Sequence, residues 1–306
     1  MGQKPSILLS GGSGLLAVNW FFCKRKEYDV YLGLNKREIK PNGGHIFSLD
    51  FSSEEKMKKQ LVEINPSMVI HTAGLTSVEK CENNPELAFH VNVELSIMVA
   101  KVTKELGITL VHISTDHLFD GLSSLVSEEE PINAINIYGR TKAQAESSVI
   151  DTNPEVLIIR TNFYGWGTSY RKSFSDYIIE SLRKKQTFSL FDDVYYTPIL
   201  AENLIKTIHD LIEKKANGIF NIVGDDRISK YNFGILIAEE FELDKSYIKK
   251  CSIHDKSSLV RRPKDMSLSN QKVCKLLGRN MGSAKQHISR LYKQEIEEKT
   301  KEIQRL

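Results

Sequence analysis

The chain has 306 residues, of which 41% are hydrophobic and 26% are charged. This composition is typical of a globular protein, and the length suits one large domain or a domain with a smaller lobe. The formal net charge of +3 is too small to favour nucleic acid or a membrane surface as a partner. Four scattered cysteines, no basic leader and no apolar run near the ~20 residues of a membrane span predict a reduced, cytoplasmic protein without a metal cluster.

The first half of the sequence alternates short apolar runs with longer amphipathic ones. Strands are predicted at 6–10, 29–34, 46–49, 68–73, 109–115 and 156–161. Helices are predicted at 14–25, 53–64, 85–106 and 138–150. Several strands are continuously apolar, as expected of strands that are buried on both faces. This order predicts an α/β fold with a doubly wound parallel sheet of the Rossmann type.

The pattern loosens after residue 161. Further helices are predicted at 172–185, 201–215, 230–241 and 266–277, and a further strand at 218–223. We expect this strand to return to the main sheet. The Rossmann domain is then predicted to comprise residues 1–165 with a return segment at about 195–225, and a smaller, interleaved substrate lobe to comprise 166–194 and 226–306. The charge-rich helix after Gln286 is predicted to be solvated or loosely docked.

The segment ILLSGGSGLLA leads from the first predicted strand into the first predicted helix. Gly11, Gly14 and Ala17 have the spacing G-x-x-G-x-x-A. In a first βα turn, Gly11 permits the tight turn, Gly14 lets backbone approach a pyrophosphate, and Ala17 lets the helix pack closely on the sheet. The unpaired N–H groups of the helix N-terminus favour phosphates. This turn therefore predicts a dinucleotide cofactor.

The residues after the second strand bear on which dinucleotide is bound. A carboxylate at this place binds the 2′-hydroxyl of NAD, but this sequence has Asn35, Lys36 and Arg37. Two cations suit a 2′-phosphate, which favours NADPH, with NADH as the alternative. Asp50, after the third strand, is placed to reach the adenine edge. The predicted cofactor site comprises Gly11, Ser13, Gly14, Leu15, Asn35, Lys36, Arg37, Asp50, Phe51, Thr72, Ala73, Gly74, Tyr138 and Lys142.

The segment YGRTKAQAE places Tyr138 and Lys142 four residues apart, on one face of a predicted helix. A free phenol has a pKa of about 10, and we expect the nearby ammonium to lower it. Such a tyrosine can donate a proton to a carbonyl oxygen as hydride reaches the carbon, and the lysine can also hold the nicotinamide ribose. The segment HISTDHLFDG supplies hydroxyls at Ser114 and Thr115, at the strand end where open α/β sheets bind ligands.

Several motifs, taken in chain order, resemble the extended short-chain dehydrogenase/reductase superfamily: GGSGLLA, HTAG, STDHLFDG, YGRTK and RTNFYG. Within it, STDHLFDG and YGRTKAQAE are similar to STDYVFDG and YGxTKxxGE of the dTDP-4-dehydrorhamnose reductase-like family. The resemblance extends to about Gly278, and RRPKDMSLSN matches the family's R-P-x-x-S-x-L-x-x signature. It implies that Thr115, Tyr138 and Lys142 are catalytic. The implied reaction is NAD(P)H-dependent reduction of the 4-keto group of a nucleotide-linked deoxysugar, in nucleotide-sugar and surface-polysaccharide biosynthesis.

A nucleotide-diphosphate sugar is thus the expected substrate. Arg262 is a candidate for a diphosphate contact because a guanidinium holds phosphate oxygens with paired donors, and Arg261 competes for that role. The sequence departs from the family where His117 replaces a tyrosine, Phe163 replaces a tryptophan and DDVYYTP replaces D-Q-x-G-x-P-T. The sugar, and the choice among dTDP, UDP, GDP and CDP, stay open. The candidate substrate residues are Thr76, Asp116, His117, Asn162, Phe163 and Arg262.

Other functions of related proteins remain as alternatives. The 4,6-dehydratases carry Thr-Asp-Glu where this sequence has Thr115, Asp116 and His117, and the missing glutamate argues against removal of water. The 4-epimerases hold NAD tightly, which the basic pair Lys36 and Arg37 mildly disfavours. The regulatory β-subunit of methionine adenosyltransferase belongs to the same family and binds NADP and a partner.

The predicted helix at 85–106 carries apolar residues on more than one face. These residues are Leu87, Ala88, Val91, Leu95, Met98, Val99 and Val102. One face must pack on the sheet, so the excess indicates a second apolar contact. In related enzymes this helix and the helix of Tyr138 form a dimer interface, and a homodimer is therefore predicted.

Overall fold

The computed structural model describes residues 4–35, 37–256 and 259–306. Within them, a seven-stranded sheet has the order β11-β6-β5-β4-β1-β2-β3, and every neighbouring pair is parallel. The strands are β1 (Ser6–Ser10), β2 (Asp29–Leu34), β3 (His45–Ser48), β4 (Met68–His71), β5 (Thr109–Ile113), β6 (Leu157–Arg160) and β11 (Gly218–Asn221). The prediction of a doubly wound parallel sheet is confirmed.

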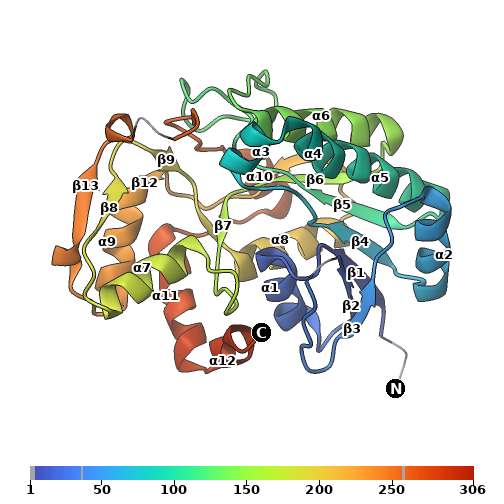
Figure 1. The fold of residues 1–306 in the computed structure, drawn as a ribbon, viewed down its shortest axis with the longest axis horizontal. Coiled ribbons are helices and arrows are strands. Elements are labelled where there is room, and N and C mark those ends of the chain that lie inside the picture. The colour runs from blue at the N-terminus through green and yellow to red at the C-terminus, as the bar shows by residue number, and fades with distance from the viewer. Residues whose placement is uncertain (1–3, 36, 257–258) are drawn as a thin grey trace.

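Helices cover both faces of the sheet (Figure 1). They are α1 (Leu15–Lys24) and α8 (Ala201–Glu213) on one face, and α2 (Glu54–Ile64), α5 (Leu95–Glu105) and α6 (Ile137–Thr152) on the other. Successive strand residues point to opposite faces, so Ile7 and Leu9 enter the core on the α1 side while Leu8 enters the core on the α5 side. Burial on both faces explains the continuously apolar strands. None of the helices in the described part of the chain is long and apolar enough to cross a membrane.

The strand order creates a crevice at the carboxyl ends of β1 and β4. The chain moves outward from β1 through β2 to β3, and then crosses back to place β4 on the other side of β1. The connections that leave β1 and β4 therefore diverge. In doubly wound sheets this switch point is where ligands bind.

The long helix predicted at 85–106 consists of three helical segments. They are α4 (Pro85–Phe89), a π-helical turn (His90–Glu94) and α5. In the π-helical turn, the fully buried Asn92 side chain accepts a hydrogen bond from the Leu75 N–H (2.8 Å) and donates one to the Thr141 hydroxyl (3.0 Å). Such turns are often found at functional sites. Here the turn ties the loop after β4 to helix α6.

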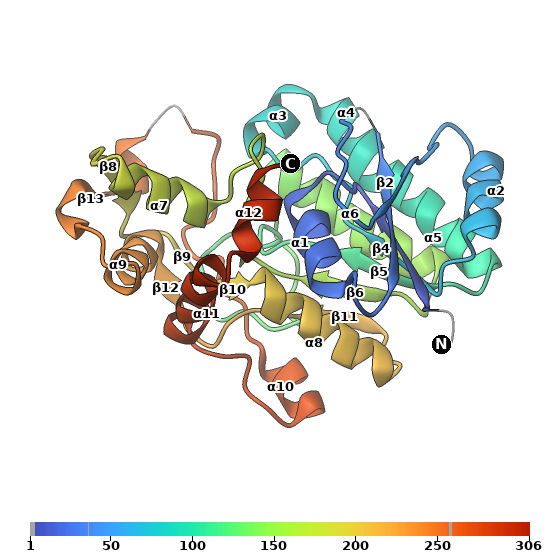
Figure 2. The same cartoon turned by 90° about the horizontal axis from the view of Figure 1, so that it is seen from below.

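A smaller lobe lies beside the sheet (Figures 1 and 2). Its helices and strand pairs are α7 (Phe174–Arg183), α9 (Lys230–Glu240), α11 (Ala284–Ile296), β8 (Phe188–Phe191) with β13 (Ile248–Cys251), and β9 (Tyr195–Tyr196) with β12 (Ile228–Ser229). A further pair, β7 (Phe163–Tyr164) with β10 (Ile199–Leu200), leads into α8. Because β11 pairs with β6 after the chain has visited the lobe, the two parts interleave as expected. The residue limits between them stay a prediction.

The prediction of a helix at 266–277 is wrong in where the helix begins. Helix α10 is Gln271–Leu277. Residues 266–270 are not helical, and Leu268 forms an isolated parallel bridge with Val126. The Ser267 hydroxyl donates to the Asp265 carboxylate (2.6 Å), and the Leu268 N–H donates to the Thr197 hydroxyl (3.1 Å). Side-chain bonds of this kind compete with the helical backbone pattern.

The expectation that the C-terminal helix is solvated or loosely docked is also wrong. His287, Ile288 and Leu291 of α11 are at most 1% exposed, and the Trp166 indole N–H donates to the Leu291 carbonyl (3.2 Å). The following helix α12 (Lys299–Gln304) buries Ile303 against the same core. The apolar stripe at one-turn spacing was hidden in the sequence by the many charges on the opposite face.

Helix α6 is attached to the sheet by a buried ion pair. The Glu146 carboxylate accepts two bonds from the Arg160 Nε (3.1 Å) and one from Nη2 (2.7 Å), and both side chains are 2% exposed. Arg160 is the last residue of β6 and also donates to the Glu128 carbonyl. Removing one member of such a pair leaves the other as an uncompensated buried charge.

We predict that Glu146→Ala lowers the free energy of unfolding by about 3–5 kcal/mol, measured by urea denaturation. Glu94→Ala, which removes the exposed partner of His90, is the matched control and should cost less than about 1 kcal/mol. Replacing Glu146 and Arg160 together by methionine should recover much of the loss. Equal destabilisation by Glu146→Ala and Glu94→Ala would contradict the structural role of the pair.

Candidate functional site

The glycine turn after β1 has the conformation that an anion site requires. Gly11 has φ +70°, and a Cβ there would lie 2.8 Å from the Cα of Ala73. Gly14 is the N-cap of α1 without a side-chain cap, and the first turn of α1 holds no acidic residue. The N-terminal N–H groups of α1 therefore have no competing carboxylate, and the turn fits a pyrophosphate.

The residues after β4 lie directly against this turn. The Thr72 hydroxyl donates to the Ser10 carbonyl (2.6 Å), and Ala73 borders Gly11. A Cβ on Gly74 would lie 3.3 Å from the Asn92 amide oxygen. The structure thus brings Thr72, Ala73 and Gly74 to the same crevice as the glycine turn, as the switch point demands.

The residues after β2 are exposed. Asn35 is solvent-facing, and the Arg37 guanidinium lies 4.3 Å from the centre of the Tyr170 ring. Lys36, predicted to contact the cofactor, lies outside the described residues. Tyr170 comes from the segment after β7 and also donates its hydroxyl to the Ser13 carbonyl (2.9 Å). No local sequence pattern points to Tyr170, because it is separated from Ser13 by more than half the chain.

Asp50, predicted to reach the adenine edge, forms its hydrogen bond and its ion pair with residues that follow it closely in the sequence. Its carboxylate accepts from the Ser52 N–H (2.8 Å) and pairs with Lys56 (3.2 Å) at the start of α2. The hydrogen bonds from Ser52 lower the pKa of Asp50 to about 2. Phe51 packs on the core of the α5 face. The carboxylate of Asp50 therefore stabilises the approach to α2.

Helix α6 brings Tyr138 and Lys142 into one buried site. Tyr138 is 8% exposed, and Lys142 is 5% exposed. The Lys142 ammonium donates to the Ile113 carbonyl (2.7 Å) and to the His112 Nε2 (3.2 Å), both at the end of β5. The Thr115 hydroxyl, two residues further on, lies beside the Tyr138 phenol and tends to lower its pKa. The three predicted catalytic residues thus meet at the carboxyl end of β5.

The expectation that the Lys142 ammonium lowers the pKa of Tyr138 is wrong. Burial raises the pKa of Tyr138 above its ordinary value, and the Thr115 hydroxyl only partly offsets this effect. Burial also lowers the pKa of Lys142 to about 8, although the Glu146 carboxylate acts in the opposite direction. Desolvation disfavours both charged forms. At neutral pH, Tyr138 is therefore a neutral phenol. Lys142 is still protonated, but its pKa lies only slightly above neutral pH.

Two buried histidines lie behind Lys142. His71 and His112 end neighbouring strands, and their rings stack at 5.5 Å. Burial and the Lys142 charge lower the pKa of His71 to about 3 and hold that of His112 well below its usual value. A neutral His112 can accept the bond from Lys142. Neither histidine stands out in the sequence, because a histidine within an apolar strand has the pattern of a buried core residue.

A second group of polar residues lies on the substrate side of Tyr138. The Asn162 amide donates to the carboxylate of Asp116, which is 2% exposed. The His117 ring meets the Tyr138 ring edge-on at 5.4 Å, and the His117 Nδ1 is buried without a partner among the described residues. Burial lowers the pKa of His117. Phe163 is half-buried in β7. These groups fit a polar ligand that supplies hydrogen bonds.

Lys230, Tyr164 and Tyr196 lie in the same region and were not among the predicted site residues. The Lys230 ammonium lies 3.3 Å from the centre of the Tyr196 ring. Burial lowers the pKa of Lys230 to about 8, opposed by the nearby Asp116 carboxylate. The hydroxyls of Tyr164 and Tyr196 are buried without partners in the part of the chain that the structure describes. A lysine at the first position of α9 carries no local signal, since only the tertiary structure brings it near Asp116.

Arg262 and Thr76 border the same region. The Arg262 guanidinium forms an ion pair with Glu79 of α3 (Val78–Asn83), a helix that the sequence analysis did not predict. Its Nε is buried without a partner among the described residues. The Thr76 hydroxyl accepts a bond from Arg171 (3.2 Å). Arg262 is therefore held by an ion pair, and its Nε–H, unpaired within the described ranges, could donate to a ligand.

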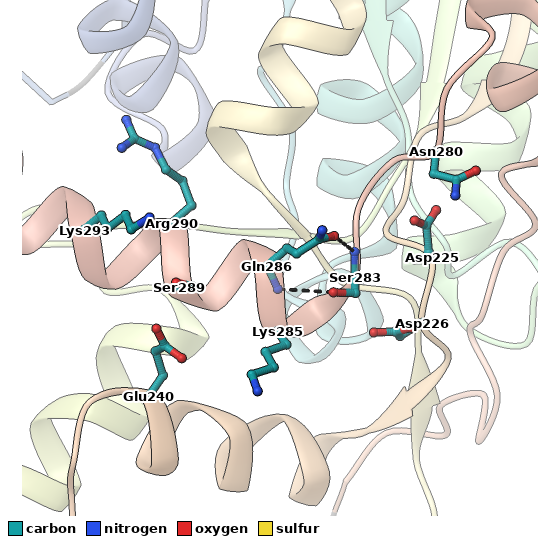
Figure 3. Close-up of a pocket in the computed structure, with 10 residues that line it drawn as sticks. All are labelled: Asp225, Asp226, Glu240, Asn280, Ser283, Lys285, Gln286, Ser289, Arg290 and Lys293. Carbon is teal, nitrogen blue, oxygen red and sulfur yellow. Dashed lines mark hydrogen bonds between the residues drawn. The ribbon is translucent and has the colours of Figure 1, made fainter.

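A surface pocket of about 730 Å³ lies elsewhere, at the start of α11 (Figure 3). None of the predicted site residues lines it. The Asp226 carboxylate accepts from the Ala284 N–H (2.8 Å), and Asp225 accepts from the Gly282 N–H (2.8 Å). The dashed lines in Figure 3 show Ser283 and Gln286 capping one another at the helix start. These acids stabilise a helix N-terminus.

The family follows from comparison with known proteins. The sequence model described as the RmlD substrate binding domain matches residues 5–296. The chain belongs to this family, which lies within the extended short-chain dehydrogenases/reductases.

Curated relatives include both reductases and a methionine adenosyltransferase subunit. The chain is 30% identical over 270 residues to the probable low-salt glycan biosynthesis reductase Agl14 of Haloferax volcanii, covering 87% of this chain and 90% of that one. It is 25% identical over 264 residues to methionine adenosyltransferase 2 subunit beta of Bos taurus, covering 79% and 74%.

Solved structures share the fold. A hypothetical dTDP-4-dehydrorhamnose reductase from Sulfolobus tokodaii is 29% identical with a TM-score of 0.79, covering 91% of this chain and 97% of that one. The dTDP-4-dehydrorhamnose reductase of Bacillus anthracis in complex with NADP has a TM-score of 0.84 over 95% and 100% of the two chains. At 23% identity, the second likeness shows the fold alone.

We predict that Lys142 and Lys230 titrate near pH 8, because burial disfavours their charged forms. Both should carry a proton below that pH and lose it above. The measurement is an NMR titration of protein labelled at the lysine ε-carbons, with Lys142→Arg and Lys230→Arg used to assign the two signals. Signals from both lysines that stay constant from pH 7 to pH 9 would contradict the described burial.

Proposed function

We propose that this protein is an NADPH-dependent reductase of the 4-keto group of a nucleotide-activated 6-deoxy sugar, in nucleotide-sugar biosynthesis. The observation that carries the proposal is the cluster of Thr115, Tyr138 and Lys142 at the carboxyl end of β5. It lies in a sheet whose glycine turn fits a dinucleotide. Family membership and the relatives named as reductases support the same conclusion.

The cofactor proposal rests on the residues around the crevice. Gly14 and the N-terminus of α1 would hold the pyrophosphate. Arg37 would meet a 2′-phosphate, and Asn35 stands where NAD-binding proteins carry an acid. The Bacillus anthracis relative is a complex with NADP. NADH remains the weaker alternative.

The chain's own residues would supply the proton. When bound, a reduced nicotinamide dinucleotide supplies a hydride to the carbonyl carbon. Tyr138 is protonated at neutral pH, because burial raises its pKa, and it donates its proton to the substrate oxygen. The Thr115 hydroxyl bonds to the same oxygen and polarises the carbonyl. Lys142, held by Ile113 and His112, orients the ribose and assists return of a proton to the phenol.

The sugar would lie between Tyr138 and the smaller lobe. Lys230, Asp116 and Asn162 offer a charged and polar wall. His117 and Tyr196 hold buried polar atoms that a sugar hydroxyl could satisfy. Buried donors and acceptors without partners are costly unless a ligand pairs with them. The free Nε of Arg262 is suited to a diphosphate oxygen.

A regulatory function is the second candidate, because one relative is a methionine adenosyltransferase subunit. A binding protein of that kind would hold NADPH without oxidising it. A 4-epimerase would be active without consuming added NADPH. Only the reductase is therefore expected to oxidise NADPH when a 4-keto sugar nucleotide is added, and an epimerase differs from the regulatory candidate in converting the sugar nucleotide.

We predict that the wild-type protein oxidises NADPH when it is given a 4-keto-6-deoxy sugar nucleotide, followed by absorbance at the reduced nicotinamide band. Tyr138→Phe should lower kcat by about 10²–10⁴-fold, because it removes the proton donor. NADPH binding should stay nearly intact in that variant. Tyr177→Phe, on the exposed side of α7, is the control and should keep full activity.

Two results would count against this proposal. NADPH binding without oxidation on dTDP-, UDP-, GDP- and CDP-linked 4-keto sugars would favour the regulatory candidate. Unchanged turnover by Tyr138→Phe would remove the proton-donor role.

We also propose that the protein is a homodimer. On α4, Leu87 is 51% exposed and Phe89 is 38% exposed, whereas Ala88 between them is buried. Most of the apolar residues predicted for a second contact are buried, but Leu87, together with Phe89, lies at the surface on a helix that contacts α6. Neighbouring exposed apolar side chains mark contact surfaces.

We predict that the wild-type protein runs as a dimer in gel filtration with light scattering. The double substitution Leu87→Glu and Phe89→Glu should give a monomer of 34.8 kDa, because two carboxylates would be desolvated in the contact. Val62→Glu, at an exposed site on α2, is the control and should remain dimeric. A wild-type mass of 34.8 kDa would refute the dimer.

A further inference from the structure

One turn of the smaller lobe reaches across the crevice. This bridging turn (residues 167–172) lies between β7 and α7. The Tyr170 hydroxyl donates to the Ser13 carbonyl (2.9 Å) in the loop after β1. The Arg171 guanidinium donates to the Thr76 hydroxyl (3.2 Å) in the loop after β4. Since β1 and β4 border the switch point, the bridging turn spans the place where the dinucleotide is expected to bind.

The base of the bridging turn is rigid. The Thr168 N–H donates to the Arg171 carbonyl (3.0 Å), and the Arg171 N–H donates to the Thr168 hydroxyl (3.1 Å). The buried Asp176 carboxylate accepts from the N–H groups of Gly167 (2.8 Å) and Ser173 (2.7 Å). A Cβ on Gly167 would lie 2.3 Å from the Arg171 carbonyl oxygen. These contacts fix the direction in which the Tyr170 side chain leaves the turn.

Tyr170 also holds the cation expected to select the cofactor. The Arg37 guanidinium lies 4.3 Å from the Tyr170 ring centre, a cation–π distance. Within the described ranges, no acidic side chain pairs with Arg37. An exposed arginine loses much conformational freedom on binding a phosphate, and a ring that already orients it reduces that loss.

We propose that Tyr170 is a specificity-determining and cofactor-retaining residue. Its ring orients Arg37 toward the 2′-phosphate of NADPH, and its hydroxyl closes the bridging turn over the glycine turn. This inference rests on the proposed use of NADPH. The two parts of the Tyr170 side chain then have different effects. The ring favours NADPH over NADH, and the hydroxyl slows the release of both cofactors.

The test compares three variants by fluorescence titration with NADPH and NADH, and by stopped-flow release of each. Tyr170→Leu removes ring and hydroxyl and should weaken NADPH about five- to tenfold, but NADH less than about twofold. Tyr170→Phe keeps the ring and should preserve the ratio of the two affinities, while release of both cofactors becomes about threefold faster or more. Tyr177→Leu, at an exposed site on the helix that follows the bridging turn, should change neither quantity.

A double-mutant cycle shows whether Tyr170 acts through Arg37. Arg37→Ala should lower the NADPH-to-NADH preference as Tyr170→Leu does, and the two changes together should add little further loss in that preference. Equal weakening of NADPH and NADH by Tyr170→Leu, or full additivity in the cycle, would overturn the specificity assignment. Unchanged release rates in Tyr170→Phe would overturn closure by the hydroxyl. A wild-type protein that binds neither cofactor would instead refute the proposed function.

Discussion

The buried ion pair between Glu146 and Arg160 is the contact on which the site geometry depends. It attaches α6 to the last residue of β6, and α6 carries both Tyr138 and Lys142. Glu146 lies one helical turn beyond Lys142 and opposes the loss of its proton. A charge pair removed from water is costly to break, so it fixes the position of α6 against the sheet more firmly than apolar contacts alone, which tolerate repacking. The position of Lys142 therefore depends on an ion pair that lies one helical turn away from it.

Burial sets the proton chemistry around this helix. The same desolvation that keeps Tyr138 neutral also lowers the pKa of Lys142 toward neutral pH and keeps His71 and His112 uncharged. A neutral phenol is ready to give a proton, and a lysine with a pKa of about 8 can pass one on. An ammonium that stabilised the phenolate would make Tyr138 a stronger acid, whereas burial weakens its acidity. Burial thus keeps the Tyr138 proton in place at neutral pH, and the substrate oxygen would have to become strongly basic, as it does when hydride arrives, to accept that proton.

The two lobes meet through side chains that are far apart in the sequence. Lys230 and Tyr196 approach Asp116 from the smaller lobe, and Tyr170 approaches Ser13 and Arg37. The Rossmann half alone provides the glycine turn and the cluster of Thr115, Tyr138 and Lys142. The smaller lobe adds the wall against which a substrate would bind and the turn that crosses the crevice. Substrate and cofactor selectivity are accordingly assigned to residues from both halves.

The sequence by itself determined the parallel sheet, because buried strands and intervening helices have distinct local patterns. It also placed Gly11 and Gly14 in the first turn and Tyr138 and Lys142 on one helix face, since these relations span only a few residues. Tertiary structure alone decided that Lys230 lies near Asp116, that the Tyr170 ring lies against the Arg37 guanidinium and that α11 is buried. It also reversed the expected shift in the pKa of Tyr138. Those properties depend on desolvation and on contacts between distant segments, which local spacing does not encode.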